Sequence, residues 1–175
     1  AVAKVVRHIE AWKSLHLDAW PSAEAQVASL ADDVAYLSHD VDDGLHAGLI
    51  TFDMLVDVPV AGPIARDVLA IAHDAEPSRA IYEVTRRMIT VMVGDIVTES
   101  RRRLAAIAPN SPDDIRAAGR AAVAFSTGMA SDLARLKSFL FQAVYHHRRV
   151  LNVMEQAEKV VRDLFAKYHA DAEAL

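Results

Sequence analysis

Hydrophobic side chains recur every three or four residues along most of the chain, which is the period of an amphipathic α-helix. The clearest row comprises Val27, Leu30, Val34, Leu37, Val41 and Leu45. We expect this row to be the buried stripe of a helix that begins after Ser22 and ends near Leu49. No segment alternates between apolar and polar residues as a strand does. The pattern therefore predicts an all-α fold of about six to eight helices.

Proline and glycine residues divide the rest of the chain into further predicted helices. A serine, a proline and two aspartates at residues 111–114 are typical of a helix start. In the longest helix, the expected core face comprises Ile81, Val84, Met88, Ile89, Met92, Ile96 and Leu104. This longest helix covers residues 77–108. The other predicted helices cover residues 3–15, 52–56, 63–73, 129–145 and 150–169. We expect residues 1–175 to form a single all-α unit.

The composition narrows the class of protein. A chain of 175 residues, 53% hydrophobic and 25% charged, can bury a sizeable core as a globular domain. Its apolar runs are too short for a membrane span, and we expect no signal peptide. The absence of cysteine excludes disulfides, thiolate catalysis and cysteine-based zinc sites, and is compatible with the cytoplasm, where we expect the protein. With a net charge of −5, the chain shows no face typical of nucleic-acid binding.

The acidic residues are concentrated in one segment. Between Ser14 and Ala65 there is no lysine or arginine, and five aspartates fall within residues 32–43. Carboxylates at this density repel one another unless water, a cation or a base offsets them. The segment is therefore either a solvated acidic face or one wall of a metal site.

Three residues of this segment share a stripe of the predicted helix. Asp32, Tyr36 and Asp40 lie four residues apart, so their side chains follow one another along a face distinct from the apolar row. A carboxylate on a rigid helix can supply an oxygen ligand to a hard divalent cation. Since most ligands of such a site must come from other elements, the helix alone does not decide between the two alternatives.

Two basic clusters have simpler interpretations. Residues 101–103 are three consecutive arginines, for which we expect a helix-dipole and solubility role at the end of a long helix. His146 and His147 point to different sides of a helix because they are adjacent, so we expect a helix-end or interface role rather than chelation.

The sequence of the acidic segment is similar to that of a known family. The run Ala-Asp-Asp-Val-Ala-Tyr at residues 31–36, followed by His39 and Asp40, resembles the deoxyguanosinetriphosphate triphosphohydrolase-like proteins of the HD-domain phosphohydrolase superfamily. Further similar stretches are residues 86–95, 99–104, 124–126, 137–141, 145–150 and 157–165. The resemblance implies a helical HD-type fold, in which residues 1–50 end the metal-binding core and residues 51–175 form a C-terminal helical region.

The resemblance also implies roles for individual residues. In the family a divalent ion, of Mg or Mn type, is bound by a histidine, a His-Asp pair and a final aspartate, which corresponds to Asp32. Tyr36 would pack against the deoxyribose, and Asp40 would accept a hydrogen bond from its 3′-hydroxyl. Arg86 and Arg87 are candidates for contacts with the phosphates, although their helix could equally present them to solvent. No catalytic residue is assigned within this chain.

One departure from the family limits this interpretation. Residues 1–31 contain His8 and His16 but no His-Asp pair, so three of the four expected metal ligands are missing. We therefore expect the C-terminal portion of a longer deoxynucleoside triphosphate triphosphohydrolase, inactive without its N-terminal half. We also expect self-association through the apolar surface that this half would cover. The alternative is a non-enzymatic helical module for oligomerisation or nucleotide sensing.

Overall fold

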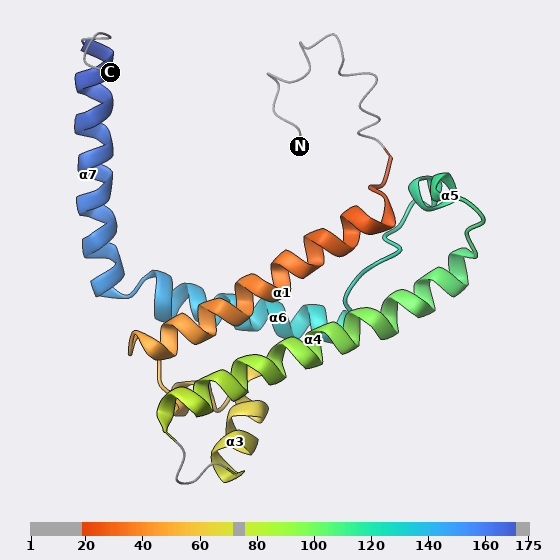
Figure 1. Ribbon diagram of the computed structural model, residues 1–175, viewed down its shortest axis with the longest axis horizontal. Helices are drawn as coiled ribbons and strands as arrows, with labels where there is room; N and C mark the ends of the chain where they lie inside the picture. The colour runs from red at the N-terminus through yellow and green to blue at the C-terminus, as the bar shows by residue number, and fades with distance from the viewer. Residues whose placement is uncertain (1–18, 72–75, 171–175) are drawn as a thin grey trace. The chain divides into compact units, whose positions relative to one another are not determined.

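The structure is a computed structural model that describes residues 19–71 and 76–170. Within these ranges the chain forms α-helices and one π-helical turn, and no β-strand occurs among the described residues (Figure 1). The elements are α1 (Ala23–His46), α2 (Phe52–Leu55), α3 (Ala61–Ile71), α4 (Pro77–Ile107), α5 (Pro112–Ala117), α6 (Thr127–Leu140), η3 (Phe141–Tyr145) and α7 (Arg148–Ala170). The predicted all-α fold is confirmed. The helix predicted over residues 3–15 lies outside the described residues.

Two compact units can be distinguished along the chain. Among the described residues, the first comprises residues 19–36 and 89–130, and the second comprises residues 37–71, 76–88 and 131–170. The long helices α1 and α4 therefore each contribute residues to both units. The division predicted at residue 50 stays a prediction.

The second unit contains most of the buried apolar side chains. They are Leu37, Val41 and Leu45 of α1; Ile50, Leu55, Val58, Ala61, Ile64, Ala65 and Val68 around α2 and α3; Ala80, Ile81, Val84 and Met88 of α4; and Leu133, Leu136 and Leu140 of α6. Their three- and four-residue spacing on each helix is the pattern that predicted the helices. Full burial of a valine, leucine, isoleucine or methionine side chain stabilises the fold by about 1.5–3 kcal/mol.

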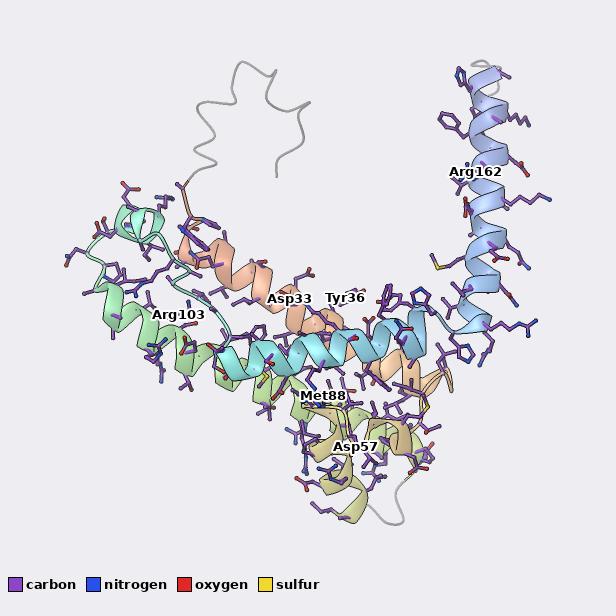
Figure 2. All side chains as sticks on the ribbon, turned by 180° about the vertical axis from the view of Figure 1, so that it is seen from behind. Asp33, Tyr36, Asp57, Met88, Arg103 and Arg162 are labelled. Carbon is purple, nitrogen blue, oxygen red and sulfur yellow. The ribbon has the colours of Figure 1, made fainter. Side chains whose placement is uncertain are left out.

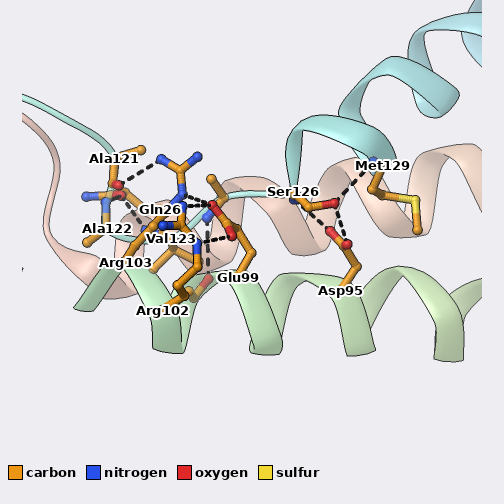
Figure 3. Close-up of polar contacts among 12 residues, drawn as sticks. Gln26, Asp95, Glu99, Arg102, Arg103, Ala121, Ala122, Val123, Ser126 and Met129 are labelled. Carbon is orange, nitrogen blue, oxygen red and sulfur yellow. Dashed lines mark hydrogen bonds and ion pairs between the residues drawn. The ribbon is translucent and has the colours of Figure 1, made fainter. Parts of the chain in front are cut away.

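Hydrogen bonds organise the irregular segment between α5 and α6 in the first unit (Figure 3). The side-chain oxygen of Gln26 accepts from the backbone N–H groups of Ala122, at 2.9 Å, and Val123, at 3.1 Å. Asp95 accepts from the backbone and the hydroxyl of Ser126, at 2.8 and 2.6 Å. Because buried backbone groups must find partners, these side chains replace the pairing that a regular element would supply.

Gln26 also explains a correction to the predicted core. Val27, which the sequence predicts as core, is 50% exposed, whereas its neighbour Gln26 is buried. Ile89 of α4, also predicted as core, is 39% exposed. At the start of α1 the buried face of the helix includes Gln26, because its side-chain amide forms hydrogen bonds with buried backbone groups. A prediction from hydrophobic periodicity treats glutamine as an exposed polar residue. It therefore assigned Val27, one residue further along, to the buried face.

The predicted start of α5 is confirmed. The hydroxyl of Ser111 accepts from the N–H of Asp114 at 3.2 Å, and Asp114 accepts in return from the N–H groups of Asn110 and Ser111. These backbone donors hold the pKa of Asp114 below its ordinary value, with the Asn110 N–H as the main cause. The arrangement is a capping box, which gives hydrogen-bond partners to backbone N–H groups at the helix start that have none within the helix.

Helix α7 is exposed along almost its whole length. Every residue from 151 to 170 is exposed, including large apolar side chains such as Val153, at 65%, and Phe165, at 70%. Side chains project from α7 on all sides, Arg162 among them (Figure 2). Within the described ranges, no helix has the length and apolar character that a membrane span requires.

Candidate functional site

The predicted stripe lies on one continuous helix. Asp32, Tyr36 and Asp40 fall within α1, and their four-residue spacing sets them on successive turns of one face, about 5–6 Å apart along the axis. Asp32 is exposed, and Tyr36 is 51% exposed. Asp40 is half-buried. The three predicted residues thus share a helix face but differ in their access to water.

Asp40 has a partner from a distant part of the sequence. The hydroxyl of Tyr145, the last residue of η3, donates a hydrogen bond to Asp40 Oδ2 at 2.8 Å. Burial raises the pKa of Asp40 above its ordinary value, and the nearby Asp43 adds to this effect. The hydrogen bond from Tyr145 acts in the opposite direction. Sequence reasoning missed Tyr145, because no local pattern connects residues so far apart in the chain.

A second aspartate of the acidic segment is held in a similar way. Asp42 is half-buried, and its Oδ1 lies 3.0 Å from the hydroxyl of Thr85 on α4. Its other carboxylate oxygen lies 3.2 Å from Nδ1 of His46, one turn further along α1. Asp42 is not among the predicted site residues, although two side chains lie within reach of its carboxylate. The hydroxyl of Thr85 also lies 3.1 Å from the carbonyl oxygen of Ile81, so its single proton is shared between two acceptors.

The two predicted phosphate-binding arginines surround one glutamate. Arg86 donates two hydrogen bonds to Glu83, both at 2.8 Å, and Arg87 donates one at 2.6 Å. The hydrogen bonds from Arg86 first, and from Arg87 second, lower the pKa of Glu83 to about 2. Glu83 is therefore ionised at neutral pH, and a phosphate group would have to compete with it for these arginines.

An open groove of the second unit lies beside one of these arginines. It has a volume of about 580 Å³ and is lined by Val68, Ile71, Ser78, Arg79, Tyr82, Glu83 and Arg87. Arg86 is not part of the lining, so the two predicted phosphate-binding residues differ in their surroundings.

The other basic clusters have structural roles. Arg102 and Arg103 both pair with Glu99, and Arg103 also donates to the carbonyl of Ala121 (Figure 3). His146 follows η3 directly, and its Nδ1 lies 2.9 Å from the carbonyl oxygen of Phe141. This position agrees with the helix-end role predicted for the histidine pair.

The described residues do not supply a metal site by themselves. Among them, no group of three or more histidine, aspartate or glutamate side chains is placed to hold an ion. Asp32 offers one exposed carboxylate, whereas a Mg or Mn ion takes about six oxygen or nitrogen ligands. Further ligands would have to come from outside the described part of the chain.

Comparisons with known proteins give the family. Residues 123–175 match the family model of the phosphohydrolase-associated domain. A deoxyguanosinetriphosphate triphosphohydrolase-like protein of Caulobacter vibrioides is 48% identical over 161 residues, which are 92% of this chain and 41% of the relative. Deoxyguanosinetriphosphate triphosphohydrolase-like protein 1 of Mesorhizobium japonicum is 41% identical over 174 residues, 99% of this chain and 43% of the relative. The chain therefore belongs to the deoxyguanosinetriphosphate triphosphohydrolase-like proteins, and it spans about two fifths of the length of these relatives.

Proposed function

We propose that this chain is the C-terminal portion of a metal-dependent deoxynucleoside triphosphate triphosphohydrolase. The reaction would release a deoxynucleoside and tripolyphosphate, and the chain would be inactive without the rest of the enzyme. The observation that carries the proposal is the Asp32, Tyr36 and Asp40 stripe of α1, in which Asp40 is half-buried and hydrogen-bonded. The names of relatives that align with 92–99% of this chain support it.

Each residue of the stripe has a role that its chemistry fits. Asp32 would be one ligand of the divalent ion, which when bound polarises phosphate oxygens and lowers the pKa of water. Tyr36, one turn further on and half-exposed, offers a flat surface to the deoxyribose. Asp40 would accept a hydrogen bond from the 3′-hydroxyl of the sugar through its carboxylate.

The arginines would act on the triphosphate. Guanidinium groups bind phosphate oxygens through short, charge-assisted hydrogen bonds. Arg87 is the better placed of the two, because it lines an open groove as well as pairing with Glu83. A triphosphate would displace Glu83 from part of this ion pair.

The test uses the protein encoded by the complete gene. We expect Mn²⁺-dependent release of tripolyphosphate from a deoxynucleoside triphosphate, and Asp32→Ala should abolish both the activity and stoichiometric Mn²⁺ binding. Asp57→Ala is the matched control, since Asp57 is an exposed carboxylate outside α1 and outside the stripe. Full activity and full metal binding in Asp32→Ala would refute the proposed role of this residue.

The same assay decides on the alternative of a non-enzymatic helical module. The exposed apolar side chains of α7 support that alternative, because a surface of this kind is typical of contacts with another chain. They equally support self-association of the enzyme. If the complete protein hydrolyses no deoxynucleoside triphosphate in the presence of Mn²⁺, the module becomes the better interpretation.

A further inference from the structure

The contact between Tyr145 and Asp40 joins two elements of the second unit. Tyr145 lies 105 positions after Asp40 in the chain, and the hydrogen bond of 2.8 Å is part-buried. Both side chains are half-buried, so water competes less with this bond than with a surface pair. The described residues provide no second hydrogen bond to the Asp40 carboxylate.

A local irregularity brings Tyr145 to this position. The buried face of α6 includes Leu136 and Leu140, and a continuing α-helix would place residue 145 about 140° away from Leu140. Instead the chain forms the π-helical turn η3, closed by a 3.1 Å hydrogen bond from the N–H of His146 to the carbonyl of Phe141. Such a turn holds more residues than an α-helical turn, so Tyr145 stays nearer to the buried face. Single π-helical turns are rare and are found frequently at functional sites.

We propose that Tyr145 is a positioning residue for Asp40, which it holds so that Oδ1 can accept a hydroxyl group of the ligand. The hydrogen bond to Oδ2 restricts rotation of the carboxylate about its terminal bond. The other oxygen is then presented in one direction, as recognition of a single sugar hydroxyl requires. This inference rests on the proposed function, which assigns the 3′-hydroxyl to Asp40.

The electrostatics of Asp40 agree with this role. Burial and the neighbouring Asp43 raise the pKa of Asp40, which favours the protonated carboxyl, a weaker hydrogen-bond acceptor. The hydroxyl of Tyr145 lowers this pKa, and the nearby His39 does so to a smaller extent. Tyr145 therefore helps to keep Asp40 in the ionised form that accepts a hydroxyl hydrogen.

The first experiment tests the contact in the 175-residue chain. The pKa of Asp40 is measured from the ¹³C shift of its carboxyl group, in the original chain and in Tyr145→Phe. We expect the pKa to rise in Tyr145→Phe, because the substitution removes the donor that favours the charged form. The control is Tyr168→Phe, which removes a hydroxyl from the exposed helix α7 and should leave Asp40 unchanged. An unchanged pKa in Tyr145→Phe would overturn the inference.

The second experiment tests positioning in the complete protein. Its KM is measured for a deoxynucleoside triphosphate and for the 2′,3′-dideoxy analogue, which lacks the 3′-hydroxyl. We expect Tyr145→Phe to raise KM for the first substrate about fivefold to tenfold, the equivalent of one hydrogen bond, and to leave KM for the analogue unchanged. An equal rise for both substrates would show a merely structural role and overturn the inference.

The two experiments separate the two proposals. If the complete protein hydrolyses neither substrate, the proposed function fails, and the carboxyl titration still decides whether Tyr145 holds Asp40. If the titration shows the contact and only the deoxynucleotide responds to Tyr145→Phe, both proposals stand.

Discussion

The strongest structural prediction concerns Gln26, a buried side chain that joins α1 to the segment before α6. Its carbonyl oxygen accepts from Ala122 and Val123, and its amide donates to the carbonyl of Pro21 at 2.8 Å. All hydrogen-bonding groups of the side chain except one N–H are thereby engaged within the first unit. Ala122 is fully buried and Val123 is 7% exposed, so both N–H groups lie away from bulk water in the folded chain.

The perturbation is Gln26→Ala, which leaves two buried backbone N–H groups without a partner. Each unsatisfied buried group costs about 1–3 kcal/mol. Partial relaxation of the segment would recover some of this loss, so we expect the free energy of unfolding to fall by about 2–4 kcal/mol. Alanine is a good helix former, so helix propensity does not contribute to this loss.

The assay combines urea denaturation with amide hydrogen exchange. We expect protection to fall at the amides of residues 122 and 123 in Gln26→Ala. The matched control is Gln156→Ala on the exposed helix α7, which should stay within about 0.5 kcal/mol of the original chain. The reasoning would be refuted if the free energy of unfolding fell no more in Gln26→Ala than in the control, and if both amides kept their protection from hydrogen exchange.

Two further predictions concern a carboxylate and a glycine. Hydrogen bonds from Arg102 and then Arg103 lower the pKa of Glu99 to about 2 from its ordinary 4.5. The ionised Glu99 therefore contributes fully to the free energy of unfolding above about pH 4.5, and this contribution is lost as the pH falls toward 2. The urea midpoint of the original chain should therefore exceed that of Glu99→Gln at pH 6 and converge with it near pH 2; a constant difference would contradict this. Gly62→Ala should lower stability by more than about 2 kcal/mol, because its Cβ would overlap two carbonyl oxygens of the preceding turn. Gly128→Ala, where the Cβ meets open space, should melt at or above the original temperature, and equal melting of the two variants would refute the steric argument.

Local signals were sufficient to predict most of the helices. Pro77 at the start of α4 and the capping residues of α5 act within one helical turn, so they can be read from a few neighbouring residues. The predicted range 77–108 differs from α4 (Pro77–Ile107) by one residue. The helix predicted over 129–145 ends in η3 instead, because one π-helical turn is too short to change the hydrophobic period detectably.

Contacts between distant segments could not be predicted in the same way. The four-residue spacing of Asp32, Tyr36 and Asp40 is a local property, and it was sufficient to predict their shared helix face. The hydroxyl of Tyr145 reaches Asp40 only after the intervening 104 residues have folded, and no pattern along the chain encodes that pairing. Gln26 was missed for the same reason, since its partners are nearly a hundred residues away.

The structure also bears on the two interpretations of the acidic segment. Asp32 and Asp43 are exposed, whereas Asp40 and Asp42 are half-buried and accept hydrogen bonds from hydroxyl groups of other elements. A solvated face would leave all of these carboxylates to water. A hydroxyl donor orients a carboxylate without neutralising it, whereas an arginine or lysine partner would cancel its charge. Asp40 and Asp42 are therefore held in direction by partners from other elements, and Asp42 in addition faces His46 one turn along α1, so the segment is not a uniformly solvated face.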